Sequence, residues 1–142
     1  MIKKNSKFSF DIYIDVSLYI IFLTYILINF DLSIANFIVL TLTLITLGFW
    51  IISRVKLGSS FSVLPEAKQL VTKGIYSKIR NPIYLFTIIA NIGIIYLLNN
   101  KYLYLIVPVI LIIQIIRIKR EEKVLIKIYG DRYLEYKKDT WF

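Results

Sequence analysis

Two polar segments, residues 57–84 and 117–136, hold the side chains that could do chemistry in this chain. In the second segment, the guanidinium of Arg117 and the carboxylate of Glu121 are four residues apart, which places them on one face of a helix. A guanidinium can hold a carboxylate through two parallel hydrogen bonds. Tyrosine faces and a nearby carboxylate can accept a cationic group. These residue types could hold a carboxylate or a cationic group.

The composition excludes several other chemistries. The 142 residues contain neither cysteine nor histidine, so the chain offers no thiol nucleophile, histidine base, disulfide or cysteine–histidine zinc site. Its five glycines are never spaced as in a dinucleotide-binding or phosphate-binding loop. We therefore expect no metal site and no Rossmann or Walker nucleotide site.

Each of the candidate residues also has a simpler interpretation when it is taken alone. Arg117 and Glu121 could be a surface pair that stabilises its helix by a few tenths of a kcal/mol. The adjacent Glu121 and Glu122 could simply balance the basic residues around them. Four tyrosines could be aromatic residues of a membrane interface: Tyr76, Tyr84, Tyr133 and Tyr136.

The apolar stretches of the chain predict an integral membrane protein. Apolar residues make up 58% of the sequence and charged residues 19%, against roughly 45–50% and 25% in soluble domains. Residues 12–30 and 34–52 match the roughly 20 apolar residues that a span requires. Residues 83–98 and 102–116 are shorter, and buried core helices of a soluble protein are the alternative for them. Asn91 and Gln114, within these shorter stretches, are expected to hydrogen-bond between helices.

The basic residues predict the orientation of the spans. All but Lys101 of the 18 lysines and arginines lie before residue 12, between residues 53 and 81, or after residue 116. By the positive-inside rule, both termini, the 53–81 loop and the 117–142 tail are cytoplasmic. A nucleic-acid surface is the alternative for the net charge of +9, but the basic residues flank spans and form no stripe. We expect one multi-pass, all-α membrane domain, residues 1–142, with four transmembrane helices in two hairpins and a cytoplasmic C-terminal helical segment.

Local signals predict where the helices of the two polar segments begin and end. Asn81 is a good N-cap residue for the third span, and Pro82 suits its first turn. Gly130 should end the helix that continues the fourth span, and Asp131 should cap a short final helix. Both polar segments then end at the cytoplasmic side of the second hairpin, where they could wall one pocket.

The order of the motifs resembles a known family. LG-x-SFS is followed by LVT-x-G-x-Y, then by R-x-P-x-Y at the start of a span, and then by R-x-x-x-EE-x-x-L-x-x-x-[YF]G-x-x-Y-x-x-Y. This combination, over about residues 57–138, is similar to the isoprenylcysteine carboxyl methyltransferase family. That family forms a wider group with the phospholipid N-methyltransferases.

The resemblance implies a membrane methyltransferase that uses S-adenosyl-L-methionine, with the lipid bilayer and a lipidic or lipidated methyl acceptor as partners. Glu121 would hold the ammonium group of the cofactor, and Arg117 would be the catalytic residue that faces the acceptor. Family members usually carry His at the position of Asn81 and Pro at that of Ile75. Further cofactor contacts are implied for Lys68, Gln69, Leu70, Val71, Tyr76, Asn81, Pro82, Ile83 and Tyr84.

The chemistry of methyl transfer favours a carboxylate as the acceptor. Displacement at a sulfonium methyl proceeds in line, so catalysis is largely alignment of the acceptor. A carboxylate is already a nucleophile at neutral pH, whereas an amine would first have to lose a proton in a chain without histidine. Two alternatives remain: a non-catalytic four-helix interaction protein with a degenerate methyltransferase site, and a related reductase that uses a nicotinamide cofactor.

Overall fold

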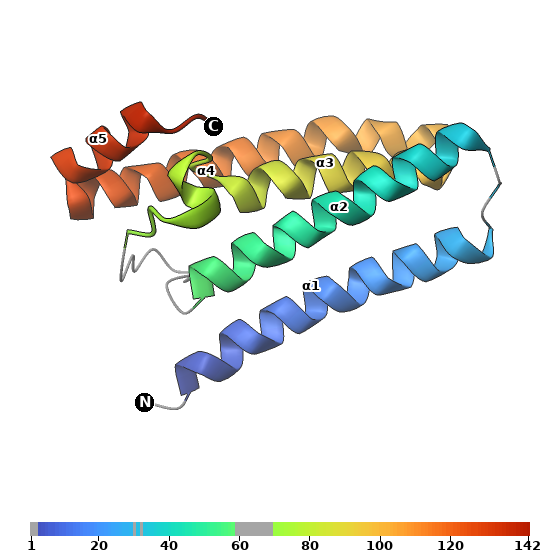
Figure 1. The fold of residues 1–142 in the computed structure, drawn as a ribbon, viewed down its shortest axis with the longest axis horizontal. Coiled ribbons are helices and arrows are strands. Elements are labelled where there is room, and N and C mark those ends of the chain that lie inside the picture. Colours follow the sequence, from blue (N-terminus) through green and yellow to red (C-terminus); the bar gives the residue numbers. More distant parts are fainter. Residues whose placement is uncertain (1–2, 30, 32, 59–69) are drawn as a thin grey trace.

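The computed structural model of the chain is a bundle of long helices (Figure 1) and describes residues 3–29, 31, 33–58 and 70–142. Its elements in chain order are α1 (Lys3–Ile28), α2 (Ile34–Leu57), the 3-10 helix η2 (Gly74–Ser77), α3 (Pro82–Leu97), the 3-10 helix η3 (Lys101–Leu105), α4 (Ile106–Tyr129) and α5 (Asp131–Asp139). Within these residues, extended backbone pairs only at an isolated parallel bridge between Ile79 and Trp141. The expected all-α fold is confirmed for this part of the chain.

The outer surface of the bundle is apolar. Large side chains stand out from the long helices, with Ile34 82% exposed on α2 and Ile28 78% exposed on α1. Contiguous exposed apolar surface is unfavourable in water and suits lipid. Two helices, Ile34–Leu57 and the continuous Lys101–Tyr129, are long and apolar enough to cross a membrane, while Tyr13–Ile28 and Pro82–Leu97 are shorter apolar helices. The number of spans remains a prediction.

Helices α2 and α3 approach each other closely where a glycine faces a threonine. A Cβ atom added to Gly93 would lie 2.1 Å from Oγ1 of Thr43, so the two helices can come this close only because glycine has no side chain. The Thr43 hydroxyl donates a hydrogen bond to the Val39 carbonyl at 2.8 Å, which satisfies it within α2. Ala90, one turn before Gly93, is fully buried. Small residues at a helix contact are typical of membrane proteins, in which they let backbones come together.

The two short connections lie at one end of the bundle and the polar segments at the other (Figure 1). In the short connections, Ser33 accepts a hydrogen bond from the Asn36 N–H at 3.2 Å. The Asn100 side chain likewise accepts one from the Tyr102 N–H at 3.0 Å. At the opposite end lie the start of α1, the end of α2, η2, α5 and the C-terminus. This arrangement agrees with the predicted hairpins, whereas which end is cytoplasmic stays a prediction.

The helices of the polar segments begin and end where the sequence predicts, but their capping differs from the prediction. Gly130 ends α4 with φ of 51°, as expected. Asp131 is the first residue of α5, and the N-cap position belongs to Gly130, so the expected aspartate cap is wrong. Asn81 occupies the N-cap position of α3 and Pro82 lies in its first turn, but the Asn81 side chain makes no capping hydrogen bond.

Candidate functional site

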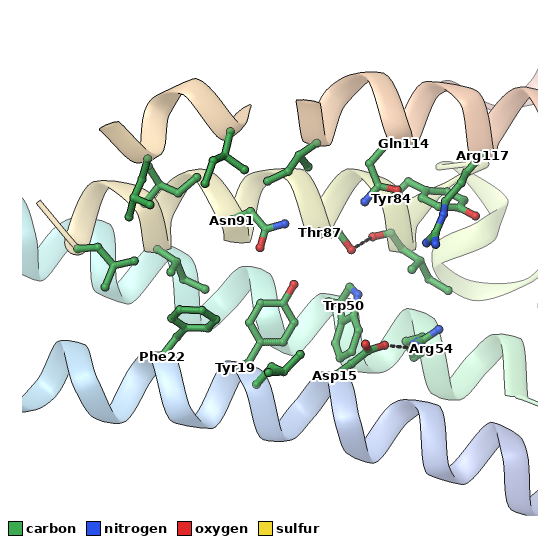
Figure 2. A pocket seen from close by; sticks show the side chains of 18 residues that line it. Asp15, Tyr19, Phe22, Trp50, Arg54, Tyr84, Thr87, Asn91, Gln114 and Arg117 are labelled. Atoms are coloured by element: carbon green, nitrogen blue, oxygen red, sulfur yellow. Dashed lines mark hydrogen bonds and ion pairs between the residues drawn. The ribbon is translucent and has the colours of Figure 1, made fainter. Parts of the chain in front are cut away.

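A pocket of about 410 Å³ lies among α1, α3 and α4, with Trp50 and Arg54 of α2 at its side (Figure 2). Its lining changes in character along the bundle. Four residues with charged or phenolic groups form what we call the charged end: Asp15, Arg54, Tyr84 and Arg117. Aliphatic residues form the opposite end: Ile94, Ile95, Leu98, Leu103 and Ile106. A cavity of this kind can take a molecule with a polar head and an apolar tail.

Tyr84 and Glu121 meet beside the charged end. The Tyr84 hydroxyl, at the start of α3, donates a hydrogen bond to Oε1 of Glu121 on α4. Glu121 lies beyond residue 116, the predicted end of the fourth span. Loss of hydration raises the pKa of the Glu121 carboxyl, while the Tyr84 hydrogen bond and the charge of Arg117 oppose this rise. The arrangement holds a carboxyl oxygen in a fixed position next to an aromatic ring.

An ion pair joins α1 to α2. Arg54, which is 6% exposed, forms an ion pair with Asp15 of α1. The guanidinium carbon of Arg54 also lies 5.2 Å from the centre of the Trp50 ring, within range of a cation–π interaction. The ring of Tyr19, one turn after Asp15, meets Trp50 edge-on with centroids 5.5 Å apart. These contacts place α1 as a wall of the pocket.

The two polar segments also contact each other outside the pocket lining. The Tyr76 hydroxyl donates to the Ser53 carbonyl of α2 at 3.1 Å, and the Tyr136 hydroxyl of α5 donates to the Tyr76 carbonyl at 2.6 Å. After α5, the chain returns alongside residues 78–81, which join η2 to α3, and there the Asn81 N–H donates to the Phe142 carbonyl at 2.9 Å. An ion pair between Lys137 and Glu122 holds α5 against α4.

The structure brings some of the predicted site residues together. Ile83, Tyr84 and Arg117 line the pocket, and Glu121 is bound to Tyr84. Figure 2 shows the Arg117 side chain reaching from α4 toward the pocket, close to Tyr84. A carboxylate, a phenol and a guanidinium from two helices thus meet at one place. Their roles in binding and catalysis stay predictions.

Other predicted residues lie outside the pocket lining. Tyr76 is buried against α2 and Pro82 is buried in the first turn of α3. Asn81 lies next to the C-terminal residues, and Leu70 and Val71 are half-buried in the irregular segment before η2. The predicted contacts of Lys68 and Gln69 fall outside the described residues.

Sequence reasoning missed several pocket residues. Asp15 is the single charge within residues 12–30, a signal that could have pointed to its pairing with Arg54. Gln114 was expected to hydrogen-bond to a neighbouring helix, but its Oε1 is buried without a partner in the described part of the chain. Gln114 lines the pocket together with Asn91. Both amides therefore face a cavity that the sequence did not reveal.

Fold and pocket together define a helical protein with an amphipathic cavity between apolar helices. The model of the phospholipid methyltransferase family matches residues 34–132, which include α2, α3 and α4. The chain therefore belongs to the phospholipid methyltransferase family, a family of membrane methyltransferases, and the wider group expected from the motifs is confirmed. No curated protein matches the chain.

Proposed function

We propose that this chain is an integral membrane methyltransferase that uses S-adenosyl-L-methionine and methylates a carboxylate on a lipidic or lipidated acceptor. The observation that carries the proposal is the Tyr84–Glu121 hydrogen bond beside the charged end of an amphipathic pocket, in a chain of this family. Four spans with cytoplasmic termini and a cytoplasmic active site complete the proposal, in the isoprenylcysteine carboxyl methyltransferase-like form that the motifs suggest.

The residues beside the pocket fit the chemistry of S-adenosyl-L-methionine, which supplies a methyl group on a cationic sulfonium and also carries an ammonium. The Glu121 carboxylate is suited to hold the ammonium, because it is an acceptor already positioned by Tyr84. The faces of nearby tyrosines suit the sulfonium. Ile83 lines the pocket, and the remaining contacts are proposed from the family motif alone: Lys68, Gln69, Leu70, Val71, Tyr76, Asn81 and Pro82.

Arg117 is proposed to orient the acceptor. Its guanidinium can bind a carboxylate through two hydrogen bonds and leave one lone pair of the carboxylate free to react. Such an acceptor is ionised at neutral pH and requires no general base. An amine acceptor would need one, and the proposal already assigns Glu121 to the cofactor ammonium. The geometry therefore supports a carboxylate as the simpler acceptor.

Binding of S-adenosylhomocysteine to detergent-purified protein, measured by calorimetry, tests the cofactor site. Glu121→Gln should weaken binding about 10- to 100-fold, since a hydrogen bond to a charged group contributes about 1.5–3 kcal/mol. Lys123→Gln, an exposed position on the same helix, is the matched control and should change little. Equal losses in both variants would remove Glu121 from the site. If the wild-type protein does not bind S-adenosylhomocysteine at about 1 mM, the result would favour the alternative, a non-catalytic interaction protein.

The chemical stability of the product tests the acceptor. Membranes that contain the protein are supplied with methyl-labelled S-adenosylmethionine, and the labelled lipid is treated with base. A methyl ester releases its label as volatile methanol, whereas an N-methyl group keeps it. If base releases labelled methanol from wild-type membranes but not from Arg117→Lys membranes, the result would support carboxylate methylation oriented by Arg117. Label that stays on the lipid would show that an amine is methylated.

A further inference from the structure

Two amide side chains line the middle of the pocket. Gln114 of α4 is 9% exposed, and its Oε1 has no hydrogen-bond partner among the described residues. Asn91 of α3 lines the same pocket, and its side chain likewise forms no hydrogen bond in the described part of the chain. Figure 2 shows both amides directed into the space between α3, α4 and α1.

Such amides are costly unless a ligand satisfies them. A buried polar group without a partner loses its hydration and gains nothing in return. In apolar helices, polar residues that face an internal cavity are candidate functional positions. Thr87, on the same face of α3, shows the contrast, because its hydroxyl donates to the Ile83 carbonyl at 2.8 Å and is satisfied. Gln114 and Asn91 are therefore, with the Tyr19 hydroxyl, polar groups of the pocket interior that form no hydrogen bond in the described part of the chain.

The positions of the amides along the helices say which part of a ligand would reach them. Gln114 precedes Arg117 by three residues, or about 4.5 Å along a helix axis, and Asn91 follows Tyr84 by seven residues, or about 10 Å. Both therefore lie between the charged end and the aliphatic end. A ligand whose carboxylate is held by Arg117 would place the linkage between its head and its tail at Gln114, with the tail side of that linkage directed toward Asn91.

We propose that Gln114 and Asn91 are specificity-determining residues that hydrogen-bond an amide linkage next to the headgroup of the acceptor. The free oxygen of Gln114 requires a donor, which an amide N–H supplies, and Asn91 can donate to the amide carbonyl. Together with Arg117, this selects a carboxylate joined to its hydrocarbon tail through an amide, of which an N-acyl amino acid is the simplest example. The inference rests on the proposed function for its carboxylate end.

A matched pair of probes isolates the N–H group. N-(9,10-dibromostearoyl)glycine and the corresponding O-acyl glycolate have the same carboxylate, carbonyl and chain, and differ only by an ester oxygen in place of the amide N–H. The chain has two tryptophans, of which Trp50 lines the pocket. In a Trp141→Phe background, quenching of Trp50 by the brominated chain, and its reversal by unbrominated competitor, reports binding without turnover.

The amide probe should bind about tenfold more tightly than the ester probe, the size of one hydrogen bond to a buried acceptor. Gln114→Met should bring this ratio close to one and leave the affinity for the ester unchanged. Ile113→Met, an exposed neighbour on α4, is the matched control and should keep the ratio. The thermal midpoint of empty Gln114→Met should stay the same or rise, because the substitution removes an unsatisfied group.

Two results would overturn the inference. A ratio near one in the wild type would show that water satisfies the amides, and an equal loss for both probes in Gln114→Met would show a purely structural role. Because the readout is binding, it does not depend on methyl transfer. A tenfold ratio without detectable methylation of the N-acyl amino acid would support the pocket assignment and count against the proposed enzymatic function, so the two failures are distinguishable.

Discussion

Replacing Gly93 with alanine should destabilise the protein, although the same change stabilises most helices. In an ordinary helix interior, glycine is about 0.5–1 kcal/mol less favourable than alanine. At Gly93, however, the new Cβ would lie 2.1 Å from Oγ1 of Thr43 and 3.3 Å from its Cβ. Thr43 is 2% exposed and its hydroxyl is bonded to Val39, so it has little room to yield. We expect a net loss of about 1–3 kcal/mol, the usual range for overpacking.

A second substitution should relieve this clash. Thr43→Ala removes Oγ1 and Cγ2 and leaves only Cβ near the added methyl group, at 3.3 Å. The double variant should therefore be more stable than the sum of the single changes predicts, by about 1 kcal/mol or more. Gly48→Ala is the matched control, because a Cβ there would meet nothing within 4 Å. It should leave stability unchanged or raise it.

Thermal unfolding of the detergent-purified variants, followed by circular dichroism, measures these effects. For a chain of this size, about 1 kcal/mol corresponds to a shift of several degrees in the unfolding midpoint. A Gly93→Ala protein as stable as Gly48→Ala would refute the close approach of α2 and α3. So would a double variant whose loss is simply additive.

Three further predictions address topology, the start of α3 and the tail. Cysteine at Ser77 should be shielded from impermeant thiol reagents in sealed, right-side-out cells while cysteine at Lys101 is labelled, and the reverse would overturn the proposed orientation. Asn81→Ser should leave the unfolding midpoint unchanged, because the Asn81 side chain makes no capping bond; a lower midpoint would show a structural role instead. If the amide contacts the cofactor, Asn81→His should keep or raise the affinity for S-adenosylhomocysteine. Burial raises the pKa of Tyr133 to about 12, so the stability from its neutral phenol is complete below about pH 10 and is lost as the pH rises through 12. Tyr133→Phe should reduce this alkaline fall in the unfolding midpoint, and an unchanged fall would assign it to other groups.

The helices could be predicted because their signals are local. Apolar stretches, the Asn81–Pro82 step and Gly130 each define an element through nearby residues, and α2, α3 and α4 begin or end within a few residues of the expected places. The Asp131 cap failed for an equally local reason, since Gly130 takes the N-cap position itself.

The extension of the pocket into the helix bundle could not be predicted because it depends on how distant helices pack. Asp15 and Arg54 are 39 residues apart, and no periodicity in the sequence pairs them. A polar residue in an apolar stretch can hydrogen-bond to a neighbouring helix or face a cavity. The amino-acid sequence of the stretch does not distinguish the two cases. Only the arrangement of α1, α3 and α4 shows that Gln114 faces the cavity.

The position of α1 has a consequence for how such a protein can diversify. This helix lies outside the family-matched residues 34–132, yet Asp15, Tyr19 and Phe22 line the pocket. Its contacts with α2 involve few side chains, chiefly the Asp15–Arg54 pair and the Tyr19–Trp50 edge contact. Tyr84, Arg117 and Glu121 all come from the matched part. Mutations in the first helix can therefore change the shape of one wall of the cavity while the carboxyl–phenol–guanidinium arrangement and the two amides, which come from the matched residues, stay intact.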